Sequence, residues 1–195
     1  MAQAARPAAR LGRGRRAADP AGRAPAGRRS VPLTPAAEAA RGFVIRTDGA
    51  ARGNPGPASA GAALYDLGRL DARDPRARPD ATVSEYLDVR TNNVAEYTAV
   101  VRALGLAAEL GAERVELLLD SKLIVEQLHG RWRVKDQKLR PLWAAALTTL
   151  RTFGAGWTAA HVPRAQNGTA DALANAAIDR VAAGGPPVVI RRPGV

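Results

Sequence analysis

The order of strand-like and helix-like segments in this chain leaves few folds open to it. Three strand-like runs come in succession, at residues 43–47, 58–65 and 81–89. Turn-rich or polar stretches separate them, and the longer stretch spans residues 66–80. Because neighbouring strands joined by such loops run in opposite directions, the three runs predict an antiparallel meander.

The second half of the chain alternates between helical periodicity and short apolar runs. Apolar residues recur every three or four positions in the helical stretches. The expected helices are 92–110, 121–128, 138–150 and 169–183, and the expected strands are 114–119 and 157–162. Strands joined by helical crossovers lie parallel. The order therefore predicts an α/β fold with one mixed sheet, whose later strands run parallel to the first, followed by a tail without secondary structure at 184–195.

Composition restricts the kinds of site that the chain can carry. It has no cysteine and only two histidines, which excludes disulfides, cysteine-based zinc sites and multi-histidine metal centres. Any metal would have oxygen ligands, so hard cations are favoured. No apolar run reaches the roughly 18 to 20 residues that span a bilayer, and the N-terminus lacks the apolar stretch of a secretory signal. We therefore expect no membrane association and a cytoplasmic location.

The net charge of +11 indicates a polyanionic partner, but it is unevenly distributed. Residues 1–40 hold eight arginines and two acidic residues among alanine, proline and glycine, a net charge of +6. With few large apolar side chains to bury, this segment is predicted to be disordered. It could hold the protein near nucleic acid, direct it to an organelle as a transit peptide, or be a dispensable extension.

Four acidic residues are predicted to converge at one edge of the sheet. Asp48 and Asp120 follow the first and fourth strand-like runs, and Glu96 and Asp171 lie in the first turns of two expected helices. The carboxyl ends of neighbouring parallel strands meet at the same edge. Singly, each residue could be a turn residue, a helix cap or a partner of the helix dipole. Together they would repel one another unless cations neutralised them, which favours a site for two divalent ions.

The segments that carry these residues resemble the motifs of type 1 ribonuclease H, in its short-loop prokaryotic branch. The matching segments are Thr47 to Pro57, Thr91 to Tyr97, Leu119 to Leu123 and Asn167 to Ala174. The resemblance covers about residues 42–183 and implies a catalytic domain over 41–183, with a five-stranded mixed sheet flanked by helices. It implies endonucleolytic hydrolysis of the RNA strand of an RNA–DNA hybrid with two Mg²⁺ ions, Mn²⁺ being possible. By matching position, the catalytic, metal-binding residues are Asp48, Glu96, Asp120 and Asp171.

The resemblance also implies a set of substrate contacts. Small polar groups near the glycine-rich turn would read the 2′-OH groups of the RNA strand. Many type 1 enzymes carry a histidine-bearing loop before the last carboxylate, but here that connection is only residues 161–167. Arg164 is expected to take its place, as in the short-loop branch, and His161, which has the register of the strand end, is the less favoured alternative. The expected substrate-binding residues are Gly53, Asn54, Gly56, Thr91, Asn92, Asn93, Ser121, Trp132, Arg164 and Asn167.

Residues 129–140 interleave basic side chains with Trp132, which is typical of a segment that follows a phosphate backbone and stacks on a base. The alternative is a solvated linker with Trp132 in the core. Gln127, just before this segment, is predicted to be an ordinary surface residue of its helix.

Two other functions stay open at this point. One is a non-catalytic module that binds hybrid duplexes, although binding alone does not require four carboxylates. The other is a different nuclease of the same superfamily, against which the cluster of asparagines argues. In each case we expect a monomer without an obligate protein partner.

Overall fold

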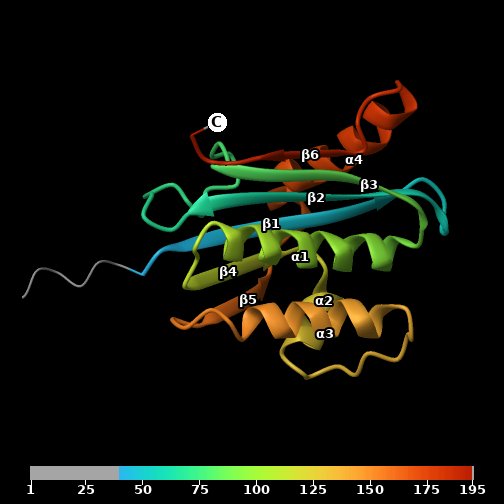
Figure 1. Cartoon of the computed structure of the whole chain (residues 1–195). Helices are drawn as coiled ribbons and strands as arrows, with labels where there is room; N and C mark the ends of the chain where they lie inside the picture. Colours follow the sequence, from blue (N-terminus) through green and yellow to red (C-terminus); the bar gives the residue numbers. More distant parts are fainter. Residues whose placement is uncertain (1–39, 195) are drawn as a thin grey trace, which may run out of the picture. The chain divides into compact units, whose positions relative to one another are not determined.

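A computed structural model describes residues 40–194, and these form one mixed sheet with helices on both faces (Figure 1). The sheet has six strands in the order β5-β4-β1-β2-β3-β6. The strands are β1 (Gly42–Ala51), β2 (Gly56–Asp66), β3 (Ala81–Arg90), β4 (Arg114–Leu119), β5 (Trp157–His161) and β6 (Val188–Arg191). The helices are α1 (Asn92–Glu109), α2 (Lys122–Leu128), α3 (Leu139–Leu150) and α4 (Gly168–Ala182), with a short 3-10 turn, η1, at Arg164–Gln166. The predicted segment 1–40 lies, except for its last residue, outside the described residues.

The pairing of the strands confirms the predicted topology. β1, β2 and β3 form an antiparallel meander, and β4 and β5 run parallel to β1. The helical connections α1, and α2 with α3, supply the crossovers that parallel neighbours require. Most predicted boundaries agree with the structure within one or two residues, because the apolar periodicity of these segments is regular.

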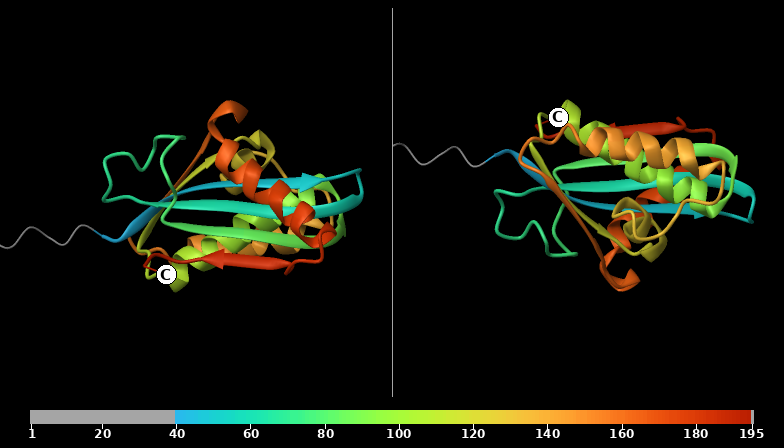
Figure 2. Two further views of the ribbon diagram at one scale, coloured as in Figure 1. Left: turned by 90° about the horizontal axis from the view of Figure 1, so that it is seen from above. Right: turned by 90° about the horizontal axis from the view of Figure 1, so that it is seen from below.

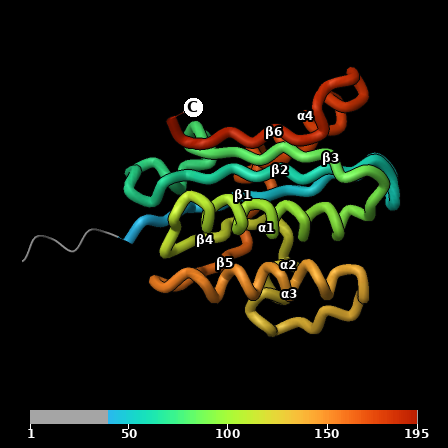
Figure 3. The backbone as a smooth tube through the Cα atoms, viewed as in Figure 1, coloured from blue at the N-terminus to red at the C-terminus, as the bar shows by residue number. Residues whose placement is uncertain are grey.

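The predicted count of five strands was wrong, because residues 188–191 form a sixth strand instead of continuing as a tail. β6 pairs antiparallel with β3 at the sheet edge, as the tube in Figure 3 shows. Arg180 of α4 fastens the approach to β6, since it donates to the carbonyl oxygens of Pro186 and Ser84 at 2.7 and 2.8 Å. Pro186 and Pro187 obscured this strand in the sequence, but proline is tolerated beside an edge strand because only one side needs hydrogen bonds.

The two faces of the sheet carry two separate apolar cores. Phe43 and Ile45 of β1 pack with α1, α2 and α3 in the larger one. Val44, between them, points to the other face, where it packs with Tyr65 and with Ala72 of the 66–80 loop. Figure 2 shows α4 and this loop on one side of the sheet and α1 on the other. A strand that is buried on both faces has consecutive apolar residues, and the start of β1 shows this pattern.

Two glycines set how closely helices approach the sheet. A Cβ on Gly49 would lie 2.1 Å from the backbone nitrogen of Glu96 in α1, and one on Gly61 would lie 2.3 Å from the carbonyl oxygen of Ala170 in α4. Gly61 is the cross-strand partner of Asp48. Gly49 of β1 therefore lets α1, and Gly61 of β2 lets α4, approach the sheet beside Asp48.

No helix among residues 40–194 is long and apolar enough to cross a membrane.

Candidate active site

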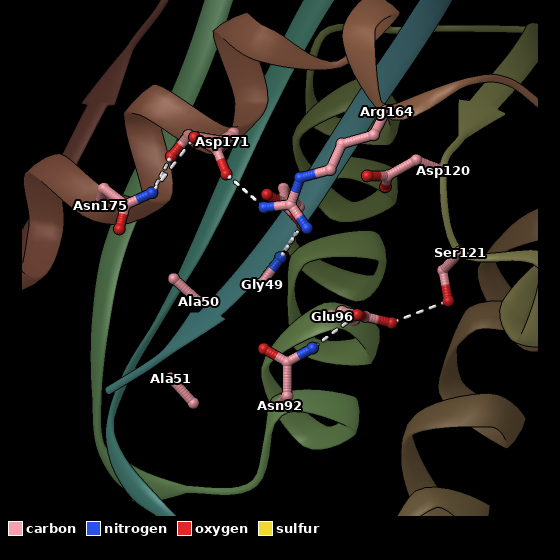
Figure 4. Close-up of a pocket in the computed structure, with 11 residues that line it drawn as sticks. Gly49, Ala50, Ala51, Asn92, Glu96, Asp120, Ser121, Arg164, Asp171 and Asn175 are labelled. Carbon is pink, nitrogen blue, oxygen red and sulfur yellow. Dashed lines mark hydrogen bonds and ion pairs between the residues drawn. The ribbon is translucent and has the colours of Figure 1, made fainter. Parts of the chain in front are cut away.

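The four predicted carboxylates line one open cavity of about 380 Å³ (Figure 4). Asp48 comes from β1, Glu96 from α1, Asp120 from the end of β4 and Asp171 from the first turn of α4. The structure therefore brings together side chains from four elements that are distant in sequence. The residues that complete the lining are Gly49, Ala50, Ala51, Asn92, Ser121, Arg164 and Asn175.

Asp48 stands where β1 separates from β4. Parallel pairing of these strands ends at Ile45, whereas β1 itself continues to Ala51, so the expectation that Asp48 ends its strand was wrong. The extension arises because β2 continues to pair with β1 beyond that point. Asp48 is 7% exposed and accepts a hydrogen bond from the Gly49 nitrogen at 2.9 Å. Burial, together with the neighbouring carboxylates Asp120 and Asp171, raises its pKa to about 7.

Glu96 is held by two side chains. Its carboxylate oxygens accept hydrogen bonds from Asn92 Nδ2 and from Ser121 Oγ, each at 2.7 Å. Burial raises the pKa of Glu96, and these two hydrogen bonds oppose that shift. The close approach of α1 at Gly49 places Glu96 beside Asp48.

Asp120 is oriented by Asn167. The Asn167 amide donates to Asp120 Oδ1 at 3.0 Å and to the Thr47 carbonyl oxygen at 2.9 Å. Asn167 is only 1% exposed and its Nδ2 donates inside the protein, so the structure gives no support to the predicted contact with substrate. The Asn167 amide instead links β1, β4 and the start of α4 directly behind the carboxylates.

Asp171 faces Arg164, the residue expected to replace a loop histidine. Arg164 Nη2 donates to Asp171 Oδ1 at 3.0 Å, and Asn175 Nδ2 donates to Asp171 Oδ2 at 3.3 Å. The negative charge of Asp48, and then the bond to Asp171, raises the pKa of Arg164. The exposed Arg164 therefore supplies a positive charge at the mouth of the cavity, as Figure 4 shows.

Helix capping and the helix dipole explain only some of the four carboxylates. The residue that precedes α2 is Ser121 and the one that precedes α1 is Thr91, and neither helix start has a side-chain capping bond. Capping therefore does not account for Asp120. Asp171 does lie in the first turn of α4, where a carboxylate is favoured by the helix dipole.

The donor chemistry of the cavity fits a hard divalent cation, because four carboxylates from rigid elements face one space. Between residues 40 and 194, no group of three or more His, Asp or Glu side chains is already arranged to hold a metal ion. The carboxylate oxygens are bonded to Asn92, Ser121, Asn167 and Arg164 instead. A bound ion would have to compete with Arg164 for Asp171.

The glycine-rich turn borders the cavity and is joined to α1. Gly53 has a φ of 101°, a conformation that favours glycine. A Cβ on Gly56 would lie 2.1 Å from the Arg52 carbonyl oxygen, so the turn can close only with glycine there. Asn54 Oδ1 accepts a hydrogen bond from the Asn92 nitrogen at 3.2 Å. The Thr91 hydroxyl oxygen is buried and has no partner within the described residues.

Trp132 borders a second cavity of about 530 Å³, together with Asn93, Arg131, Arg133 and Lys135. Trp132 is 46% exposed, so the alternative that it fills the core was wrong. Val134, between Arg133 and Lys135, and Leu139, which begins α3, enter the core instead. Burial of these two residues fixes the segment while its aromatic and basic side chains stay accessible.

Gln127 was wrongly predicted to lie on the surface. It is 4% exposed and accepts a hydrogen bond from the Tyr97 hydroxyl at 2.6 Å. Trp143 donates to the Gln127 carbonyl oxygen at 3.1 Å, so α1, α2 and α3 meet at this residue.

Asn175 was missed by the sequence analysis. Its spacing of four residues from Asp171 places both on one face of α4, which is the signal that could have revealed it. His161 lies at the end of β5, where its Nε2 is 3.2 Å from the Asp120 carbonyl oxygen.

Comparisons with known proteins agree with this geometry. Residues 46–177 match the family model described as reverse transcriptase-like. The chain is 40% identical over 142 residues to the bifunctional protein Rv2228c of Mycobacterium tuberculosis, which covers 71% of this chain and 36% of that protein. It is 42% identical over 134 residues to ribonuclease HI of Halobacterium salinarum, which covers 68% of this chain and 62% of that protein. The chain thus spans about a third of the first relative and less than two thirds of the second.

Solved structures give the same result. The crystal structure of the Halobacterium salinarum RNase H1 superimposes with a TM-score of 0.64 at 40% identity, over 71% of this chain and 98% of that one. LC11-RNase H1, isolated from compost, was solved in complex with an RNA/DNA hybrid; it superimposes with a TM-score of 0.63 at 35% identity, over 72% of this chain and 99% of that one. Fold, cavity and sequence together show that the chain belongs to the ribonuclease H family.

Proposed function

We propose that this chain is an endoribonuclease that hydrolyses the RNA strand of RNA–DNA hybrids with the aid of divalent cations, Mg²⁺ in the first place and Mn²⁺ as an alternative. The observation that carries the proposal is the convergence of Asp48, Glu96, Asp120 and Asp171 in one open cavity. The hybrid bound to LC11-RNase H1, a structural neighbour, supports the choice of substrate.

Asp48, Glu96, Asp120 and Asp171 are the residues that would hold the cations. When bound, two such ions would activate the attacking water and stabilise the charge that develops on the leaving 3′ oxygen. Asn167 keeps Asp120 turned toward the cavity, and Asn92 and Ser121 do the same for Glu96. The protein thus orients two of its four carboxylates, Asp120 and Glu96, before any ligand binds.

The exposed guanidinium of Arg164 would bind the scissile phosphate. Charge-assisted hydrogen bonds from arginine to phosphate are strong and directional. Since Arg164 already bonds Asp171 at 3.0 Å, phosphate and cation would replace that contact rather than add to it. Arg164 then holds the substrate next to the carboxylates.

Selection of the RNA strand would fall to groups beside the cavity. Asn54, Asn92 and Asn93 carry donors and acceptors suited to 2′-OH groups, and the glycine-rich turn lets backbone approach the duplex. Ser121 donates its hydroxyl hydrogen to Glu96, so its part would be to orient that carboxylate beside the substrate. A monomer suffices, because every carboxylate comes from one chain.

The test is cleavage of matched RNA–DNA, RNA–RNA and DNA–DNA duplexes with Mg²⁺ or Mn²⁺. We expect internal cleavage of the RNA strand of the hybrid alone. Asp48→Asn should abolish cleavage and keep most hybrid binding, whereas Asp71→Asn, on the exposed 66–80 loop, should cleave like the wild type. Binding of hybrid without cleavage by the wild type would identify a binding module, and cleavage of DNA would identify another nuclease.

A further inference from the structure

Arg46 is a charged side chain buried beneath the second face of the sheet. It lies on β1 two residues before Asp48, and is 1% exposed. Because alternate residues of a strand share a face, Arg46 and Asp48 point to the same side as α4 and the 66–80 loop. Burial lowers the pKa of Arg46, and the nearby Tyr65 and Asp74 oppose that shift. A buried guanidinium is costly unless it is well hydrogen-bonded, so its partners are informative.

The guanidinium joins two segments that are far apart in sequence. Nη1 donates to the carbonyl oxygen of Gln166 at 2.7 Å, and Nη2 donates to the carbonyl oxygen of Arg73 at 2.9 Å. Gln166 belongs to the turn at residues 163–167, and Arg73 belongs to the 66–80 loop. Arg46 therefore connects this turn to the loop from within the sheet.

The 66–80 loop provides a firm support at Arg73. The Arg73 side chain makes two hydrogen bonds to Glu116 of β4, each 2.9 Å long. Ala72, the preceding residue, is fully buried against Val44 and Tyr65. With its side chain bonded to Glu116 and its neighbour packed, Arg73 presents its carbonyl oxygen at a defined position.

The 163–167 turn, at the other end of the connection, carries two residues of the candidate active site. Arg164 contacts Asp171 at 3.0 Å, and Asn167 contacts Asp120 at 3.0 Å. Gln166 stands between them, so the hydrogen bond from Arg46 holds the turn from behind.

We infer that Arg46, supported by the 66–80 loop, is a positioning residue that holds the 163–167 turn so that Arg164 and Asn167 face the carboxylates. This gives the loop a role in the site although none of its residues lines the active-site cavity. The effect on catalysis rests on the proposed function; the effect on the turn itself does not.

The first test is hydrogen–deuterium exchange of the full chain without metal or substrate. Arg46→Met removes both donors at similar side-chain length, and Arg46→Lys can reach one carbonyl oxygen. For Arg46→Met we expect the Gln166 and Asn167 amides to exchange about tenfold faster, the scale of one lost hydrogen bond. Arg46→Lys should give a smaller increase. A peptide from β2 serves as an internal reference for global opening.

A matched pair of variants tests the support by the loop. Arg73→Met and Arg102→Met each remove an arginine bonded twice to a glutamate, Glu116 and Glu85 respectively. Only Arg73→Met should speed exchange in the 163–167 turn, since Arg102 lies on α1 away from it. Equal exchange of the turn in these two variants would overturn the role of the loop.

The second test is hybrid cleavage. Arg46→Met should lower kcat about tenfold to a hundredfold, the scale of misplaced catalytic groups, with KM changed by less than about twofold. In an Arg164→Ala background, Arg46→Met should lower kcat much less, because both substitutions act through the placement of Arg164. The inference would be overturned if Arg46→Met had the kcat of the wild type and the same exchange rates in the turn. It would also be overturned if the losses in kcat from Arg46→Met and Arg164→Ala were fully additive.

The outcomes separate this inference from the proposed function. If the wild type cleaves no hybrid, the proposed function fails, and exchange of the turn still decides whether Arg46 holds it. If Asp48→Asn abolishes cleavage while Arg46→Met behaves like Arg102→Met, the function stands and the inference fails. Should Arg46→Met not fold, Arg46→Lys and Arg73→Met decide by the same two measurements.

Discussion

At the scale of single residues, the neighbours of each carboxylate decide what it can do. Asp48 is the most deeply placed of the four, and burial acts on its charge more strongly than its one backbone hydrogen bond. The carboxylates of Asp120 and Asp171 add repulsion. Between about pH 4 and pH 7 the raised pKa therefore favours a protonated Asp48 in the folded protein, and a bound cation would replace that proton.

This shift makes the stability of the metal-free protein depend on pH. The folded pKa of Asp48 is raised from 3.8 to about 7, so its ionisation costs stability increasingly as pH rises across that window. Asp48→Asn removes this cost. The free energy of unfolding of the variant minus that of the wild type should therefore increase from pH 4 to pH 7. Urea denaturation with EDTA across this range measures it. Parallel curves for the two proteins would contradict the expectation, and Mg²⁺ at pH 8 should stabilise the wild type more than the variant.

Gln127 supports a second prediction at this scale. Its amide oxygen accepts from the Tyr97 hydroxyl inside the core, so Gln127→Leu leaves a buried donor without a partner. We expect a loss of about 1–3 kcal/mol in the free energy of unfolding. Adding Tyr97→Phe should recover part of that loss, because both partners are then apolar. Urea denaturation of the two single variants and the double variant checks this, and additive losses would show that the bond is unimportant.

At the scale of elements, the site depends on how closely two helices reach the sheet. α1 descends at Gly49 and α4 at Gly61, on opposite faces, and each brings one carboxylate to Asp48. Both contacts are between the sheet and the backbone of a helix, so rotation of a side chain cannot relieve a clash there. The distances between the carboxylates thus depend on glycine at positions 49 and 61 as well as on the acidic residues themselves.

Gly61→Ala tests this contact. The new methyl group would lie 2.3 Å from the Ala170 carbonyl oxygen, so α4 must move outward and carry Asp171 with it. We expect hybrid cleavage to fall about tenfold or more, as misplacement of a catalytic group does, with a lower melting temperature. Gly105→Ala, on α1 with nothing within 4 Å, is the control and should gain up to about 1 kcal/mol of stability without loss of activity. Unchanged cleavage by Gly61→Ala would mean that Asp171 does not need this spacing.

At the scale of the whole molecule, positive and negative charge are divided between different surfaces. The cavity concentrates four carboxylates, whereas the basic residues beside Trp132 border the neighbouring cavity. Arg131 is engaged with Glu126, so Arg133 and Lys135 are the freer of these cations. When a duplex lies at the carboxylates, the positive charge that balances its phosphates would lie on that second surface.

Salt dependence of hybrid binding tests this division. Each phosphate contact contributes a slope of about −0.9 to the plot of log K against log salt. Arg133→Gln with Lys135→Gln should reduce the magnitude of the slope, whereas Arg76→Gln with Arg78→Gln, on the 66–80 loop, should leave it unchanged. Fluorescence anisotropy with the Asp48→Asn protein measures binding without cleavage. Equal slopes for the two double variants would favour a plain linker at residues 129–140.

Local pattern accounts for the parts of the structure that the sequence predicted. Regular periodicity in α1 and the apolar run of β4 located those elements. The four acidic residues were selected because each was expected to end a strand or to lie in the first turn of a helix. Asp48 instead lies inside β1, and Glu96 lies beyond the first turn of α1. β6 and Gln127 were not found. The strand is stabilised by pairing with β3 and the side chain by Tyr97, and both partners are remote in sequence.

The order of elements, the expectation of oxygen ligands and the choice of the four candidate carboxylates followed from the sequence, because each depends on residue type and on neighbours within a few positions. That Asn167 orients Asp120, and that Arg46 joins the 66–80 loop to the turn before α4, became visible only in the folded chain. The physical reason is that a buried polar group must find its partner wherever the fold supplies one. The partners of these three contacts lie 47, 120 and 27 residues apart along the chain.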